Sequence, residues 1–174
     1  RSRGLGDVYK RQTVNAGKSR SYGAEASLRA AVTDALTLNA CYGYTYATFK
    51  DYATSDENNY KGNYVPFVPK HTLSLGGQYI FRINPGHWLD RIQVNANYTG
   101  AGRIYWTEQN NASQSFYGTL NGRLSFQKGN GQVDFWVRNA LDKDYAAFYF
   151  ESMGNGFMQK GRPIQAGIEL RCRF

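Results

Sequence analysis

Aromatic and cationic residues occur together in three stretches of the 174-residue chain, near residues 60–64, 103–106 and 149–162. Rigid rings and cations suit an anionic, partly apolar chelate, because the rings supply contact area and cation–π attraction while the cations offset charge. The residues that we expect to contact such a ligand are Tyr60, Lys61, Tyr64, Arg103, Tyr105, Trp106, Tyr149, Phe150, Met158, Lys160 and Arg162. An aromatic belt at a membrane interface, with loops that pack on themselves, explains the same residues equally well.

The other residue types that perform chemistry are scattered along the chain. His71 and His87 are isolated and no Cys-x-x-Cys or His-x-x-x-His spacing occurs, so we expect no metal site. No serine-elbow motif or Cys–His dyad occurs, so we predict no catalytic residues, no enzyme activity and no cofactor. Cys41 and Cys172 fall on opposite phases of the pattern described below, which predicts two free thiols.

A strict two-residue alternation of apolar and polar residues fills the segments between the aromatic stretches. It begins at 22–32, where Tyr22, Leu28 and Val32 share the apolar phase. The pattern returns in six further segments, five of them at residues 36–49, 71–82, 91–103, 115–127 and 163–174 and one that begins at 132. Alternation of this kind predicts strands with one apolar and one polar face. The fold class is therefore all-β, with about seven antiparallel strands in sequence order.

Three observations favour a transmembrane β-barrel over a soluble β-sandwich, which remains the alternative. The predicted strands have roughly 11–14 residues, whereas soluble strands average about 5–6 and tilted membrane strands need about 9–11. Short connections, such as 33–35, alternate with long ones, such as 50–70 and 146–162. Aromatic residues gather at both ends of the strands, as in the two girdles of a barrel. The mean hydropathy of −0.60 fits such a barrel, because alternation hides the lipid-facing residues.

The two phases predict which residues face lipid and which face the lumen. We expect the lipid side to include Leu28, Tyr42, Leu75, Val94, Leu120, Phe135 and Leu170. The charged residues of the other phase are Glu25, Arg29, Arg123, Asp134, Arg138, Glu169, Arg171 and Arg173. We expect them to line the lumen and to form cross-strand ion pairs, with contact to a plug or an anionic ligand as the alternative.

Residues 1–12 fit no alternation and resemble non-native junction sequence, which leaves 13–174 as the barrel portion. They also contain four of the 21 basic residues, so the net charge of +8 does not indicate nucleic-acid binding. A single-chain bacterial barrel needs an even number of strands, and an open sheet edge is costly in lipid. We therefore expect the remaining strands to precede residue 13.

Four stretches resemble, in order and spacing, the C-terminal part of the barrel of TonB-dependent outer-membrane receptors of the siderophore-receptor type. Residues 15–25 resemble a strand entry of that family with an aromatic residue before Gly-x-Glu. Residues 64–75 resemble its Pro-x-x-Pro-basic-His entry, and 161–174 resemble its last strand. Residues 139–145, Asn-Ala-Leu-Asp-Lys-Asp-Tyr, resemble its Asn-Leu-Phe-Asp-Lys-x-Tyr motif, with Ala140 and Leu141 in place of the commoner Leu and Phe.

The resemblance implies a 22-stranded barrel in the outer membrane of a Gram-negative bacterium, with a plug domain inside it. It implies active import of a scarce ligand, most commonly a ferric siderophore, with cobalamin, haem and glycans as other ligands of the family. The partners that it implies are outer-membrane lipid, the plug and remaining strands, TonB and the assembly machinery. An outer-membrane barrel of another kind, such as a porin or a barrel enzyme, remains the alternative.

The last strand ends with an apolar phase that resembles the signal recognised by the outer-membrane assembly machinery. Its residues are Ile168, Leu170, Cys172 and Phe174. The family pattern favours an aromatic residue two positions before the end, where this chain has Cys172. We therefore expect a functional but weaker signal.

Overall fold

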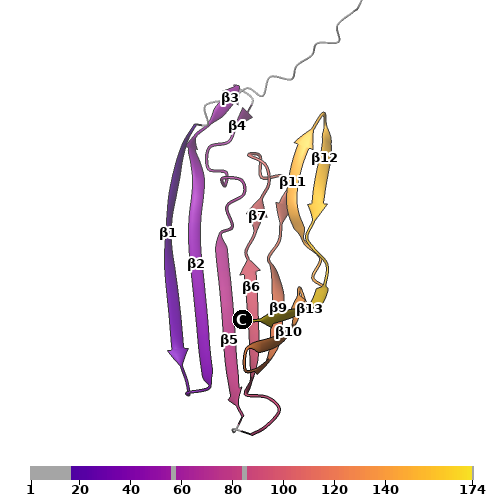
Figure 1. Cartoon of the computed structure of the whole chain (residues 1–174). Coiled ribbons are helices and arrows are strands. Elements are labelled where there is room, and N and C mark those ends of the chain that lie inside the picture. Colours follow the sequence, from indigo (N-terminus) through magenta and orange to yellow (C-terminus); the bar gives the residue numbers. More distant parts are fainter. Residues whose placement is uncertain (1–16, 56–57, 84–85, 174) are drawn as a thin grey trace, which may run out of the picture.

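The computed structural model describes residues 17–173 except 56–57 and 84–85, and seven of its strands form one sheet. They are β1 (Lys18–Ala31), β2 (Leu36–Asp51), β5 (His71–Arg82), β6 (Arg91–Ala101), β9 (Tyr117–Lys128), β10 (Gly131–Arg138) and β13 (Gln165–Cys172). Every pairing is antiparallel and joins strands that follow one another in the sheet order β1-β2-β5-β6-β9-β10-β13. Figure 1 shows a single layer, which confirms the sequential sheet and excludes a sandwich of two stacked sheets.

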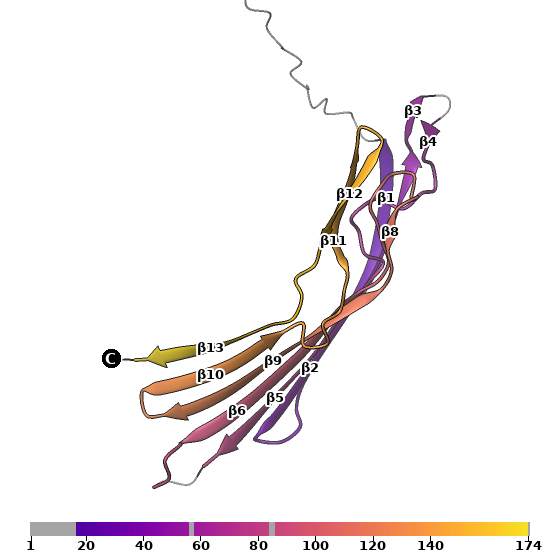
Figure 2. The same ribbon diagram turned by 90° about the vertical axis from the view of Figure 1, so that its right-hand side faces the viewer.

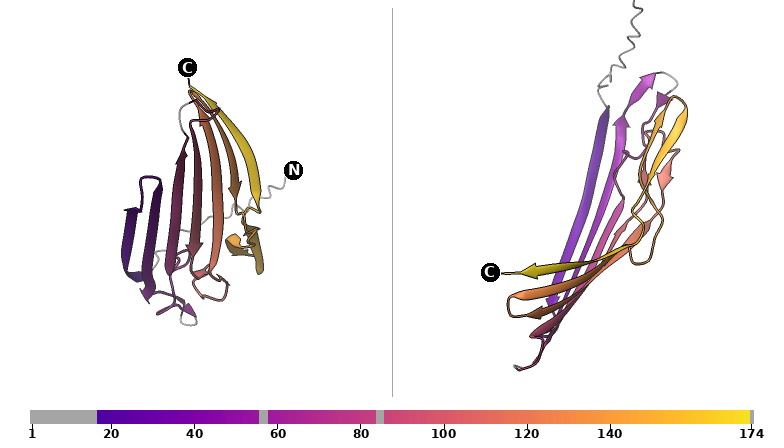
Figure 3. Two further views of the ribbon diagram at one scale, coloured as in Figure 1. Left: turned by 90° about the horizontal axis from the view of Figure 1, so that it is seen from below. Right: turned by 45° about the vertical axis from the view of Figure 1, so that its right-hand side comes forward.

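The sheet curves into an open trough rather than closing on itself (Figure 3). β1 and β13 form its two edges and have no further partner strand among the described residues. In the part of the chain that the structure describes, no helix is long and apolar enough to cross a membrane. A curved, unclosed antiparallel sheet is the form expected of part of a barrel wall.

Three two-stranded hairpins extend from one end of the trough, where long loops were expected (Figure 2). They are β3 (Ala53–Ser55) with β4 (Asn58–Asn59), β7 (Ile104–Tyr105) with β8 (Ser113–Gln114), and β11 (Ala146–Ser152) with β12 (Asn155–Lys160). In β11–β12 the pairs Tyr149–Met158 and Phe150–Phe157 lie directly opposite each other. The long connections were therefore predicted, but not the hairpins that they contain.

The ends of several strands differ from the sequence prediction. β6 ends at Ala101 rather than near residue 103, and β10 and β13 have only 8 residues each. β13 begins two residues after Pro163, whose ring nitrogen has no hydrogen to donate to a strand partner. The amide of Ile164 is also engaged elsewhere, because it donates to the Asp142 carboxylate at 2.8 Å.

The pairing register aligns the apolar phases of all strands on one face. One row across five strands consists of Leu28, Ala40, Leu75, Tyr98 and Leu120. A second row consists of Val94, Leu124, Phe135 and Ile168. The alternation therefore predicted the faces correctly.

The apolar face is the convex one. Its large side chains stay exposed, for example Leu28 at 68% and Leu170 at 76%. On the polar face Asp134 is fully buried and Ser125 is 6% exposed. Side chains spread apart on a convex surface and crowd together on a concave one, so these exposed fractions agree with the prediction that the apolar phase lies on the convex side.

The two cysteines lie apart, as predicted. Cys41 is in β2 on the polar phase, and Cys172 is in β13 on the apolar phase. Both are free and exposed.

Candidate functional site

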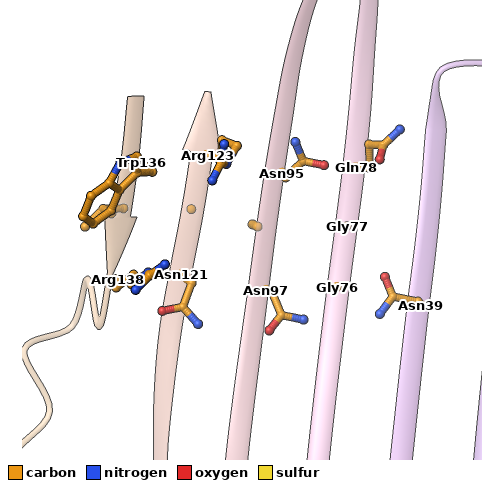
Figure 4. Close-up of a pocket in the computed structure, with 13 residues that line it drawn as sticks. Asn39, Gly76, Gly77, Gln78, Asn95, Asn97, Asn121, Arg123, Trp136 and Arg138 are labelled. Atoms are coloured by element: carbon orange, nitrogen blue, oxygen red, sulfur yellow. The ribbon is translucent and has the colours of Figure 1, made fainter. Parts of the chain in front are cut away.

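The middle of the concave face is a shallow hollow of about 460 Å³ lined mainly by carboxamide side chains and glycines, with Arg123, Trp136 and Arg138 on one side. Carboxamides from four neighbouring strands point over it (Figure 4). One row across the sheet consists of Asn39, Gly76, Asn97 and Asn121, and the next of Gln78, Asn95, Arg123 and Trp136. These rows extend the polar phase of the sequence into a continuous hydrogen-bonding surface.

Gly76 makes the hollow possible. It lies directly opposite Asn39, and a Cβ at Gly76 would collide with the Asn39 carboxamide. The missing side chain lets the Asn39 carboxamide lie across the wall.

The carboxamides are only partly used by the protein itself. Asn97 Nδ2 lies 3.4 Å from both Ser74 Oγ and the Leu75 carbonyl oxygen, which are long contacts. Gln93 Nε2 donates to Asn95 Oδ1 at 3.2 Å. Because a carboxamide offers two donors and two acceptor lone pairs, most of this capacity remains for water or for a polar partner.

A balanced cluster of four charges lies beside the hollow and joins β9, β10 and β13. Arg123 Nη1 lies 3.0 Å from both Asp134 Oδ2 and Glu169 Oε2. Arg171 Nε lies 2.7 Å from Glu169 Oε1, and its Nη2 lies 3.6 Å from Asp134 Oδ2. Gln132 Nε2 donates to the other oxygen of Asp134 at 2.7 Å. These contacts confirm cross-strand ion pairs among the predicted lumen charges, and they show how Asp134 is buried with all its charge compensated.

At the long-loop end of the sheet, a pocket of about 290 Å³ brings together Tyr64, Arg103 and Tyr105, all expected ligand contacts. The rings of Tyr64 and Tyr105 stack with centroids 5.3 Å apart and an interplanar angle of 7°. Lys70 also lines the pocket, with its Nζ 5.7 Å from the centroid of Tyr64. His71 completes this side of the lining.

Lys70 and His71 were not among the residues expected to contact a ligand. Lys70 Nζ also lies 6.0 Å from the ring centroids of Tyr44 and Tyr46, so three tyrosines surround one ammonium group. Both residues belong to the Pro-Lys-His strand entry within 64–75. The Pro-Lys-His motif could have identified Lys70 and His71, because it places a cation beside Tyr44 and Tyr46 of β2.

The remaining expected contacts fall into two groups. Trp106 is 8% exposed and packs in a small core with Ile104 and Ala146, which matches the loop-packing interpretation. Tyr60 packs on Tyr52, with ring centroids 5.3 Å apart. The exposed side chains that lie away from the pocket are those of Lys61, Phe150, Met158, Lys160 and Arg162. The structure therefore groups three expected residues in one pocket and distributes the others over the loops and hairpins.

Tyr149 lies in the β11–β12 hairpin and is half-buried. Its hydroxyl donates to Glu151 Oε1 at 3.0 Å. This hydrogen bond raises the pKa of the Tyr149 hydroxyl, and desolvation adds to the effect. Tyr149 is thus a neutral hydrogen-bonding group at the long-loop end.

The Asn-Ala-Leu-Asp-Lys-Asp-Tyr motif forms a hydrogen-bond network, centred on Asn139, between the end of β10 and the start of β13. Asn139 is 4% exposed and adopts a left-handed conformation with φ of 47°. Its Nδ2 donates to the carbonyl oxygens of Lys143 at 3.1 Å and Arg162 at 3.0 Å, and its Oδ1 accepts from the Lys143 amide at 2.9 Å. The motif therefore holds the long β11–β12 excursion closed at its base.

Two predictions fall partly or wholly on undescribed residues. Ile168, at 64% exposed, and Leu170 lie on the convex face of β13, and Cys172 is exposed beside them. Phe174, the last residue of the predicted assembly signal, lies outside the described residues, as does the predicted junction segment 1–12. Both predictions stay predictions.

Comparison with known proteins places this geometry in a family. The family model for the TonB dependent receptor-like β-barrel matches residues 2–140. The ferrichrome outer membrane transporter/phage receptor of Escherichia coli (strain K12) is 28% identical over 147 residues, which is 82% of this chain and 19% of that protein. The ferric-pyoverdine M114 receptor PbuA of Pseudomonas sp. (strain M114) is 30% identical over 167 residues, which is 93% of this chain and 19% of that protein. The chain thus spans about a fifth of the length of these relatives.

Solved structures share the fold. The ferric yersiniabactin uptake receptor FyuA from Yersinia pestis matches with a TM-score of 0.80 and 22% identity, over 92% of this chain and 24% of that one. The siderophore receptor PiuA from Acinetobacter baumannii matches with a TM-score of 0.72 and 18% identity, over 90% of this chain and 22% of that one. The chain therefore belongs to the TonB-dependent receptor-like β-barrel family and is a wall segment of an outer-membrane barrel.

Proposed function

We propose that the protein containing this chain imports a ferric siderophore across the outer membrane, and that this chain forms part of its wall and ligand-capturing rim. The observation that supports the ligand class best is the pocket at the long-loop end. It combines the stacked Tyr64 and Tyr105 rings with two cations, Lys70 and Arg103. Aromatic faces and cations together favour an anionic chelate that carries apolar or aromatic groups.

The two surfaces of this chain suit different steps of import. The rim pocket is small and offers cations, so it favours first capture of an anionic ligand from outside. The concave wall offers uncharged carboxamides, which exchange hydrogen bonds with water and with polar partners at little cost. In this proposal the plug domain lies against that wall, TonB acts through the part of the protein that precedes this chain, and the assembly machinery inserts the barrel.

The capture step can be tested on the intact receptor with defined probes. Binding of ferric pyoverdine and ferric citrate would be followed by quenching of tryptophan fluorescence, and import by cellular uptake of the ⁵⁵Fe-labelled chelates. We expect Tyr105→Ala and Arg103→Gln each to weaken binding by roughly five- to tenfold for the chelate that wild type binds, the size of a lost cation–π or ion contact. Arg29→Gln removes the same charge from the polar face at the other end and serves as the control.

The outcomes separate the proposal from its alternatives. Unchanged binding in both rim variants would remove the pocket from the ligand site. Passage of either chelate without saturation and without an energy source would indicate a porin-like barrel instead of active import. The proposal includes no catalytic role for this chain.

A further inference from the structure

The rim pocket is built from two segments that belong to different long connections. Tyr64 comes from the connection between β2 and β5, and Tyr105 comes from strand β7. A backbone hydrogen bond joins the two segments beside the pocket, because the Phe67 amide donates to the Tyr105 carbonyl oxygen at 2.8 Å. A second connection runs through the side chain of Asn110, which lies between β7 and β8.

The backbone of Tyr64 pairs with β2 on one side only. Its bridge partner is Thr48, and the next amide, that of Val65, donates to the Ala47 carbonyl oxygen at 3.1 Å. In this antiparallel pattern the amide and the carbonyl of Tyr64 itself point away from β2. Because Tyr64 is half-buried, these two groups need partners from another part of the protein.

The carboxamide of Asn110 provides both partners. Its Oδ1 accepts from the Tyr64 amide at 2.7 Å, and its Nδ2 donates to the carbonyl oxygens of Tyr64 at 2.9 Å and Thr107 at 3.0 Å. The side chain thus pairs with Tyr64 as the backbone of a third strand would. A carboxylate could not replace it, because it accepts hydrogen bonds but has no hydrogen to donate to the two carbonyls. Asn110 also has a φ of 59°, a left-handed conformation that asparagine adopts more readily than most residues.

The position of the Tyr64 backbone determines where its ring lies. The ring stacks on Tyr105 and also packs against Tyr46, with centroids 5.5 Å apart and an interplanar angle of 71°. We propose that Asn110 is a positioning residue of the rim pocket, whose carboxamide holds Tyr64 against Tyr105 before a ligand arrives. A pocket that is already formed loses less conformational freedom on binding, so the ligand binds more tightly. This inference rests on the proposed capture function of the pocket.

Hydrogen exchange of the intact receptor tests the hold on Tyr64 without any ligand. Asn110→Gly removes the carboxamide but tolerates the positive φ. We expect the peptide that contains the Tyr64 amide to exchange roughly fivefold faster in this variant than in wild type, the effect of about one net hydrogen bond. Asn111→Gly is the matched control, because the Asn111 side chain makes its hydrogen bonds within the same turn, with Thr107 and Gln109. Its exchange should equal that of wild type.

A double-mutant cycle tests whether Asn110 acts on the ligand through Tyr64. Binding of ferric pyoverdine and ferric citrate would be measured for Asn110→Gly, for Tyr64→Ala and for the two changes combined. Each single change should weaken binding of the chelate that wild type binds, by roughly fivefold for Asn110→Gly. Asn110→Gly should cause no further loss when Tyr64→Ala is already present. If Asn110→Gly gives no folded band on unheated gels, Asn110→Asp replaces it, since it keeps the acceptor but loses the donor.

The outcomes distinguish this inference from the proposed function. The positioning role alone is overturned if the Tyr64 peptide exchanges as slowly in Asn110→Gly as in wild type, or if Tyr64→Ala weakens binding and Asn110→Gly does not. It is also overturned if Asn110→Gly causes the same loss with and without Tyr64, because Asn110 would then act elsewhere. If Tyr64→Ala binds the chelate as wild type does, the capture site itself is wrong, and the positioning role is overturned with it.

Discussion

Replacing Asn139 with alanine is expected to destabilise the barrel by about 4 kcal/mol, a large part of the stability of an ordinary domain. The change removes three side-chain hydrogen bonds, from Nδ2 to the carbonyls of Lys143 and Arg162 and from the Lys143 amide to Oδ1. Each buried hydrogen bond contributes about 1 kcal/mol, which gives about 3 kcal/mol. Alanine must also adopt the left-handed conformation of Asn139, with φ of 47°, at a further cost of about 1 kcal/mol.

Two companion variants separate these contributions. Asn139→Gly loses the same hydrogen bonds but tolerates the positive φ, so it should be about 1 kcal/mol less destabilised than Asn139→Ala. Lys143→Ala is the matched control, because Lys143 takes part in the Asn139 hydrogen-bond network only through its backbone amide and carbonyl. Its effect should stay within about 0.5 kcal/mol.

The assay is urea unfolding of the intact receptor in detergent micelles, followed by the loss of the folded band on unheated gels. Asn139→Ala should unfold at the lowest urea concentration, Asn139→Gly at a slightly higher one, and Lys143→Ala together with wild type. If Asn139→Ala and Lys143→Ala unfold at the same urea concentration, the Asn139 hydrogen-bond network does not stabilise the base of the β11–β12 segment, and the predicted loss of about 4 kcal/mol is wrong.

Three further predictions concern other parts of the sheet. The hydrogen bond from the Gly129 amide and the contact with Lys128 hold the pKa of the Asp90 carboxyl below its ordinary value. The ionised carboxylate therefore stabilises the folded receptor above the unfolded pKa, and this stabilisation is lost as pH falls through the folded pKa. Asp90→Asn should lower the urea midpoint at pH 7, and the midpoints of the variant and of wild type should converge on acidification. Gly23→Ala should sharply reduce the folded band on unheated gels, because a Cβ at residue 23 would collide with the Tyr44 carbonyl oxygen. Gly77→Ala should fold normally, because a Cβ at residue 77 would have Leu38 Cδ2 as its nearest neighbour, at 3.4 Å. Equal folded bands for the two variants would contradict this. Deleting Phe174 should lower the amount of folded receptor in the outer membrane and Cys172→Tyr should not, as measured by heat-modifiable mobility, and equal yields for the deletion and wild type would disprove the assembly-signal role.

The strands and their faces could be predicted because membrane strands leave a strong two-residue signal. Leu28, Leu75 and Leu120 fall in one register row, as their phases require, since a slip of one residue would move a whole strand's apolar set to the other face. The hairpins could not be predicted in the same way. In β11 the consecutive residues Phe148, Tyr149 and Phe150 are all aromatic, so this strand shows no alternation.

The candidate sites show the same division. Aromatic and cationic composition identified Tyr64, Arg103 and Tyr105, but not their grouping with Lys70, which depends on how the 60–70 segment folds over the end of β2. The conformation of that segment includes Phe67 at φ of 64°, a left-handed backbone that a bulky residue seldom adopts. The motif at 139–145 was identified by resemblance alone. Its role in tying two strands together depends on a contact of Asn139 with Arg162, 23 residues away, which no local pattern indicates.

Because every strand of the main sheet pairs with its neighbours in the sheet order β1-β2-β5-β6-β9-β10-β13, the wall is modular in units of one hairpin. Removing β5 and β6 together would leave β2 and β9 antiparallel and able to pair, and duplicating them would preserve every other pairing. Each such event would change the circumference of the barrel by two strand spacings, roughly 10 Å, without altering the alternation of the remaining strands. A gene that encodes this wall can therefore widen or narrow the barrel by gain or loss of a single hairpin segment, while substitutions within a strand leave the number of strands unchanged.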